Sequence, residues 1–165
     1  MEITVTTARA AEILGIGYEG LRSYLKRGLL GSSGVMLPFV GRDAPAPDLS
    51  AVRATWKRFG FTDLCLMRLA KQLIGMGLTF EQANSLISRE EMRRLFRKGA
   101  PAPDTMLVCW PPHFDFALLE TKNSEISKGL QGVGDLAILI KLNAIADHVS
   151  QQLGTEAICR PTPVR

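Results

Sequence analysis

The sequence lacks the features by which membrane-spanning and secreted proteins are identified. None of its apolar runs is long enough to cross a bilayer, although 46% of its residues are hydrophobic. The first residues, Met1–Val5, carry an acid at Glu2 where a secretory signal has basic residues, and no apolar block with a cleavage site follows. These absences predict a cytoplasmic protein that does not enter a membrane.

Cysteine and histidine are also scarce. The three cysteines, Cys65, Cys109 and Cys159, lie far apart, and no two have the short spacing of zinc or redox sites. We expect buried or inert thiols; the alternative is a redox sensor that pairs Cys109 with Cys159, joined by His113. Neither His113 nor His148 has a nucleophile or metal-ligand pattern around it. The sequence therefore predicts no enzymatic activity, no catalytic residue, no metal and no cofactor.

Charge is divided unevenly along the chain. Residues 1–99 hold 15 of the 20 Lys and Arg but only 9 of the 16 Asp and Glu, whereas residues 100–165 are net acidic. Lys and Arg that neutralise phosphates supply much of the sequence-independent affinity for nucleic acids. The division favours a nucleic-acid-binding first domain and a second region that faces a partner.

Two short helices are predicted at the start of the chain. Hydroxyl residues open the 6–14 segment and can cap a helix, and a glycine follows the segment. The segment 18–27 resumes helical spacing, with Leu21 and Leu25 one turn apart, and Gly28 ends it. The prediction is a helix, a short turn and a second helix.

The next thirty residues hold two runs rich in glycine, serine and proline, which are too rich in breakers to form an element. Leu37–Val40 and Thr55–Phe61 have the β-branched and aromatic content of two hairpin arms. A helical turn over Ser50–Thr55 is the alternative. We interpret residues 31–61 as an enlarged wing.

Helical patterns return after this segment. Thr62 and Asp63 are placed to cap a helix that runs to the glycines at 75–77. Thr79 and Gln82 have the spacing of a capping box for a further helix, and Glu90–Lys98 extends the helical signal. The Pro-rich step that begins at Gly99 predicts a boundary between a first domain, residues 1–99, and a C-terminal region, residues 100–165.

The C-terminal region begins with two apolar segments, Thr105–Trp110 and Phe114–Leu119, that flank a pair of prolines and predict a small hairpin. Val133–Leu153 predicts a long amphipathic helix with an apolar stripe at alternating four- and three-residue steps, the spacing of a coiled-coil seam. We expect this stripe to mediate dimerisation, through Ile138, Leu142, Ile145 and Val149.

Two parts of the first domain have a more specific likeness. The segment from Thr6 to Leu30, and the segment from Phe61 to Ile87 with its glycine-containing turn and capped helix, resemble the DNA-binding domain of MerR-family regulators. The resemblance covers residues 3–87, with 31–58 unmatched. It implies a winged helix-turn-helix domain. With the patterns of residues 100–165, the sequence predicts a mainly α protein in which this domain is followed by a small α+β C-terminal region with a long amphipathic helix.

The resemblance also implies a role for the second helix. Tyr18–Lys26 is the helix expected to enter the major groove, and Arg22 stands at the position of the family's recognition-helix arginine. Glu19 and Gly20 depart from the family, which more often has a basic and a hydroxyl residue there. The expected DNA contacts on the helix are Tyr18, Arg22, Ser23, Tyr24 and Lys26.

In the wing, Arg53, Lys57 and Arg58 are placed to reach flanking phosphates or the minor groove, and an exposed loop face is the alternative for them. The expected function is that of a homodimeric, sequence-specific transcriptional regulator. Its expected partners are double-stranded DNA, a second copy and the transcription machinery. The alternatives are a phage-type architectural or packaging factor, and an adaptor that uses the same fold to bind a protein.

Overall fold

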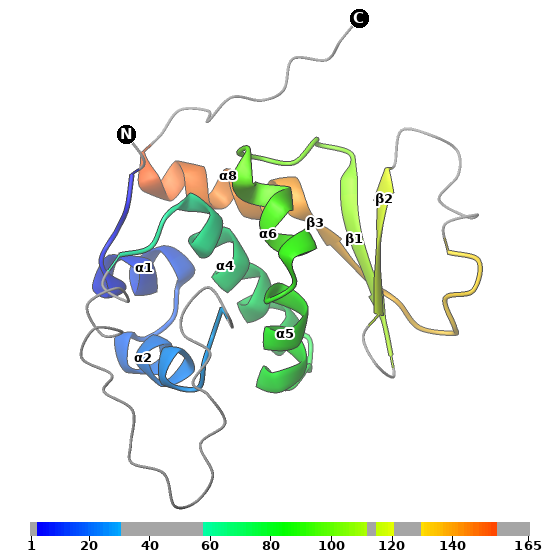
Figure 1. The fold of residues 1–165 in the computed structure, drawn as a ribbon, viewed down its shortest axis with the longest axis horizontal. Coiled ribbons are helices and arrows are strands. Elements are labelled where there is room, and N and C mark those ends of the chain that lie inside the picture. Colours follow the sequence, from blue (N-terminus) through cyan, green and yellow to red (C-terminus); the bar gives the residue numbers. More distant parts are fainter. Residues whose placement is uncertain (1–2, 31–57, 112–114, 121–129, 155–165) are drawn as a thin grey trace, which may run out of the picture. The chain divides into compact units, whose positions relative to one another are not determined.

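The computed structural model describes residues 3–30, 58–111, 115–120 and 130–154, and it divides into two compact units (Figure 1). The first unit is Met1–Arg93 and the second is Arg94–Arg165. The division falls earlier in the chain than the Pro-rich step at Gly99, where the sequence places the domain boundary.

The first unit opens with the two predicted helices, α1 (Thr7–Leu14) and α2 (Tyr18–Lys26). The Thr6 hydroxyl accepts a hydrogen bond of 3.4 Å from the backbone N–H of Arg9 and so caps α1. Gly15 ends α1 in the left-handed conformation, with φ of 62°, which glycine adopts without steric cost. The turn between the helices therefore follows from local sequence.

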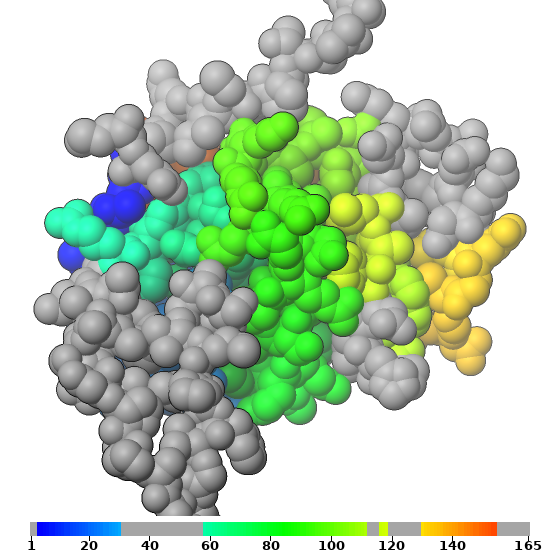
Figure 2. Space-filling model, in the orientation of Figure 1, coloured from blue at the N-terminus to red at the C-terminus, as the bar shows by residue number. Residues whose placement is uncertain are grey.

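Three further helices follow the segment 31–57: α4 (Phe61–Gly75), α5 (Phe80–Ile87) and α6 (Glu90–Arg97). The capping box of α5 is confirmed, because the Thr79 and Gln82 side chains each bond to the other's backbone N–H, at 3.2 and 2.9 Å. The segment from α5 to α6 lies at the surface on the face that Figure 2 shows, in green.

The predicted start of α4 is wrong by two residues. The helix begins at Phe61, which the sequence pattern assigns to a hairpin arm of the wing, and its N-cap is Gly60. Asp63 stabilises this end from inside the first turn, because its Oδ2 accepts a 3.2 Å hydrogen bond from the backbone N–H of Gly60. Asp63 also binds Arg93 at 3.0 Å, with both side chains about one-quarter exposed, so that this arginine has a structural role.

The core of the first unit lies where α1 packs on both α2 and α4, and where α4 packs on α5. Apolar side chains from these four helices are 0–1% exposed, among them Ile13, Leu14, Leu21, Leu64, Leu69, Leu73 and Leu86. Full burial of each such side chain stabilises the fold by about 1.5–3 kcal/mol before entropic costs. The inner face of α2 is part of this core.

A lysine on α4 holds the turn between α1 and α2. The ammonium of Lys71 donates hydrogen bonds to the carbonyl oxygens of Leu14, at 2.7 Å, and Gly15, at 3.1 Å. These carbonyls lie at the C-terminal end of α1, where a helix leaves its acceptors unpaired and where positive charge is favourable. Lys71 therefore fixes the position from which α2 starts.

The segment before α1 pairs with the segment before α4. Val5 and Phe59 form an antiparallel bridge through two backbone hydrogen bonds of 2.9 Å. Arg58, beside this bridge, is exposed and donates to the Thr4 hydroxyl at 3.5 Å. The remainder of the expected wing, including Arg53 and Lys57, lies outside the described residues.

The second unit contains a three-stranded antiparallel sheet of order β2-β1-β3, followed by α8 (Leu142–Leu153). The strands are β1 (Thr105–Trp110), β2 (Asp115–Glu120) and β3 (Ile138–Lys141). The predicted hairpin of β1 and β2 is confirmed, with β2 one residue later than expected. The centre of β1 is fully buried, and α8 packs against this strand.

The predicted long helix over Val133–Leu153 is wrong in its first half. Ile138 lies in β3, which pairs with β1, and the helix starts only at Leu142. A short apolar run fits a strand and a helix equally well by spacing, and pairing with the distant β1 decides for the strand. Leu142, Ile145 and Val149 are at most 5% exposed in the single chain, so these residues fill its core rather than form an open seam.

Cys65 and Cys109 are both fully buried, and burial raises the pKa of each thiol, which keeps it protonated and unreactive. Cys159 and His113 lie outside the described residues. Within the described ranges, no group of three metal-ligating side chains is close enough to hold an ion. In the same part of the chain, no helix combines the length and apolarity that a membrane span requires.

Candidate nucleic-acid interface

Helix α2 has one buried and one exposed side. Leu21 is fully buried and Leu25 is 6% exposed, and the two are one turn apart on the inner side. The opposite side, which we call the outer face, consists of exposed residues at helical spacing. The outer face is formed by Tyr18, Glu19, Arg22, Ser23 and Lys26. Four of the five predicted DNA contacts on this helix therefore lie together on one exposed surface.

Contacts on the outer face are local. Arg22 Nη1 lies 3.2 Å from Oε1 and 3.4 Å from Oε2 of Glu19, one turn earlier, and its guanidinium is 5.7 Å from the centre of the Tyr18 ring. The side chains of Arg22 and Glu19 are 44% and 78% exposed. An ion pair this open to solvent contributes about 0–1 kcal/mol, so Arg22 can leave it for a stronger acceptor such as a phosphate.

Tyr24, the fifth predicted contact on α2, has a different place. Its ring is stacked on that of Phe80 in α5, with centroids 5.4 Å apart and planes 13° from parallel. Tyr24 is half-buried, and its ring is used for packing between α2 and α5. We therefore leave Tyr24 out of the outer face.

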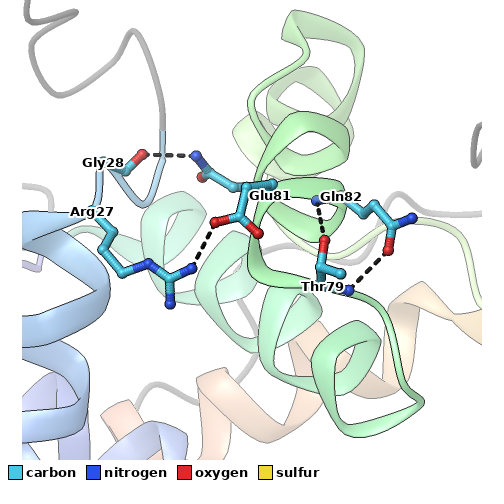
Figure 3. A network of polar contacts seen from close by, with 6 residues as sticks. Arg27, Gly28, Thr79, Glu81 and Gln82 are labelled. Atoms are coloured by element: carbon cyan, nitrogen blue, oxygen red, sulfur yellow. Dashed lines mark hydrogen bonds and ion pairs between the residues drawn. The ribbon is translucent and has the colours of Figure 1, made fainter.

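The end of α2 is held by α5 (Figure 3). Arg27 makes a 2.7 Å ion pair with Glu81, and its guanidinium lies 4.0 Å from the centre of the Phe80 ring. Two hydrogen bonds lower the pKa of the Glu81 carboxyl: the larger effect comes from the backbone N–H of Glu81 itself, and the next from the Arg27 side chain. The ion pair, with side chains 47% and 73% exposed, is as open to solvent as that of Arg22 and contributes little, so the contact with the Phe80 ring is what distinguishes Arg27. No local sequence pattern indicated this contact.

Asn84 completes this attachment. Its side-chain amide donates to the carbonyl oxygen of Gly28 at 2.9 Å, and its Oδ1 accepts from the backbone N–H of Leu30 at 3.0 Å. Leu30 has a φ of 75°, a conformation that costs a residue with a side chain about 1–2 kcal/mol. Asn84 therefore holds a strained turn, and the 54 to 56 residues between the partners explain why no local pattern indicated it.

The outer face offers two cations, one serine hydroxyl, one phenol and one carboxylate. The helix packs on Phe80, and Lys71 and Asn84 bind the turns before and after it. Such a set can bind phosphates and the edges of bases. No protein-family model matches the chain, and no curated protein shows significant similarity to it.

Proposed function

We propose that the protein is a sequence-specific, DNA-binding transcriptional regulator, and that it inserts α2 into the major groove with the outer face toward the bases. The observation that carries this proposal is the outer face itself. Tyr18, Arg22, Ser23 and Lys26 stand exposed on a helix whose opposite side, at Leu21, is anchored in the core.

The arrangement of α1 and α2 supports the same proposal. In helix-turn-helix proteins the second helix lies in the groove and the first crosses the backbone, which requires a short, rigid turn between the two. Here the turn contains Gly15 in the left-handed conformation, and Lys71 binds two of its carbonyl oxygens. The helix that would carry the contacts is thus fixed before DNA arrives, so that little order has to be gained on binding.

Pairing of two copies is part of this proposal, because one groove helix reads only a few base pairs and regulators of this kind bind paired half-sites. The stripe from Ile138 to Val149 is not the surface for it, since Ile138 lies in a strand and Val149 is buried. Sedimentation of the full chain with and without a two-site duplex measures the pairing directly.

The test of DNA binding is the affinity of the full chain for random duplexes over a range of salt concentrations. Binding through phosphates releases counterions, so the logarithm of the affinity falls with the logarithm of the salt concentration by about 0.9 per phosphate. A flat response would overturn the proposal and favour the adaptor that binds a protein.

Two lysine variants locate the interface. Lys26→Ala removes a cation from the outer face, and we expect it to reduce the salt slope by about one phosphate. Lys141→Ala removes the same charge from the exposed end of β3 in the second unit and is the matched control. Equal losses from both variants would show a general effect of charge and would contradict the placement of α2 in the groove.

Arg22→Ala tests the central contact. We expect affinity for the preferred sequence to fall on the order of 10-fold, because the variant loses a charged donor and leaves Glu19 without its partner. Specific binding that survives this substitution would refute the assignment of α2 as the recognition helix.

A further inference from the structure

The outer face of α2 contains one residue that works against a purely electrostatic interface. Glu19 is the only acid on the helix, it is 78% exposed, and it faces the same side as Arg22 and Lys26. A carboxylate on a surface that approaches phosphates repels them and cancels part of the charge of its neighbours. If phosphate attraction alone determined binding, this position would favour a neutral or basic side chain.

The stability of α2 does not fully explain why residue 19 is an acid. Glu19 lies in the first turn of α2, where a negative charge interacts favourably with the helix dipole, but this effect needs an acid only somewhere in that turn. The ion pair with Arg22 is open to solvent on both sides and contributes little. What distinguishes position 19 is that its carboxylate is held directly beside the arginine that we assign to the bases.

The chemistry of this pair matches two neighbouring base edges. In the major groove cytosine presents an amino donor, which a carboxylate accepts, and guanine presents the N7 and O6 acceptors, which a guanidinium binds in bidentate fashion. Side chains three residues apart on a helix are about 5–6 Å apart at their Cβ atoms, and successive bases along a strand are about 3.4 Å apart. The two side chains can therefore reach adjacent base pairs.

We propose that Glu19 is a specificity-determining residue, which accepts a hydrogen bond from the N4 amino group of a cytosine while Arg22 binds a guanine of the adjacent base pair. This inference rests on the proposed DNA binding. The ring of Tyr18 lies on the same face, with its centre 5.7 Å from the Arg22 guanidinium.

The experiment is selection of bound duplexes from a randomised pool by the full chain and by two variants. Glu19→Gln keeps the size of the side chain but replaces a carboxylate by an amide, which pairs best with adenine. We expect the preference at one position of the site to change from cytosine to adenine, with the preference for cytosine reduced about 10-fold or more. The adjacent guanine preference should remain.

Glu12→Gln is the matched control. Glu12 also pairs with an arginine three residues away, Arg9, at 2.8 Å, and it is 66% exposed, but it lies on α1. We expect this variant to select the same sequences as the unchanged chain. Circular dichroism of both variants checks that the helices are retained, which the exposure of both positions favours.

The possible outcomes separate the two proposals. A uniform rise in affinity for all sequences in Glu19→Gln, with an unchanged base preference, would overturn the specificity role and leave DNA binding standing. A preference change in Glu12→Gln as large as that in Glu19→Gln would also overturn it. If the unchanged chain binds no duplex at any salt concentration, the proposed function and this inference both fail.

Discussion

The outer face of α2 and the attachment of α2 to the rest of the first unit are held by different kinds of contact. On the outer face Arg22 interacts with Glu19 and Tyr18, which are three and four residues away. The attachment uses long-range contacts, in which Leu21 enters the core and Asn84 binds the turn after the helix. One set of residues therefore fixes the helix, and another leaves it available for binding, so that stability and binding can be altered separately.

The largest expected effect comes from the inner side of the helix. Leu21→Ala removes a fully buried side chain, and we expect the free energy of unfolding to fall by about 3 kcal/mol. Ser23→Ala, on the outer face of the same helix, should change it by less than about 0.5 kcal/mol. Urea unfolding measures both values. Similar losses in the two variants would contradict the division of α2 into an anchored and an available side.

A smaller loss is expected at the turn after α2. Asn84→Ala leaves the part-buried carbonyl of Gly28 and N–H of Leu30 without their side-chain partner, which costs about 2 kcal/mol. Ser85→Ala, at the next and exposed position of α5, is the control and should cost less than about 0.5 kcal/mol. If Asn84→Ala unfolds at the same urea concentration as its control, the side chain does not hold the turn.

The smallest effect concerns pH. The pKa of Glu81 is lower in the folded chain than its usual value, so its contribution to stability is present in full above the usual glutamate range and is lost as the pH falls through the folded-state pKa. We therefore expect Glu81→Gln to be less stable than the unchanged chain at neutral pH. The difference should disappear at a pH below the glutamate range.

The same comparison in chains that also carry Arg27→Gln tests how much Arg27 contributes to the lowered pKa of Glu81. Arg27 supplies part of the shift and the backbone N–H of Glu81 supplies the largest part, so the pH-dependent difference should become smaller without vanishing. A difference that is the same at neutral and acidic pH would contradict the linkage to the Glu81 charge. Thermal or urea unfolding at both pH values provides the comparison.

Much of the fold could be predicted because its signals are local. The Thr6 cap, the left-handed Gly15 and the capping box of Thr79 and Gln82 each involve residues within a few positions of one another. Their physical basis is the need of helix ends for hydrogen-bond partners, which the sequence displays directly. The hairpin of β1 and β2 could be predicted for a similar reason, because a proline pair separates two segments of β-forming residues.

The errors lie where distant residues decide. Ile138 and Leu142 have helical spacing. Ile138 nevertheless belongs to a strand, because it pairs with β1, and the helix starts only at Leu142. Phe61 has strand propensity, yet its position beside Gly60 and Asp63 makes it the first residue of a helix. In both places a tertiary or capping interaction outweighed the propensity of a short segment.

The candidate site divides in the same way. The exposure of Arg22 and Lys26 follows from the helical period once Leu21 is placed in the core, and it was predictable. The inward stacking of Tyr24 was not, because its partner Phe80 belongs to a helix more than fifty residues away. The contributions expected from Arg53 and Lys57 lie outside the described residues.

The two tyrosines of the chain, Tyr18 and Tyr24, are both in α2, one on the outer face and one stacked on Phe80. A fluorine label incorporated at every tyrosine would thus give two resonances, and both would report on this one helix without any substitution. The Tyr18 resonance would respond to a ligand on the outer face, and the Tyr24 resonance to loosening of α2 from α5. The two tyrosines therefore report separately on ligand binding at the outer face and on the attachment of α2 to α5.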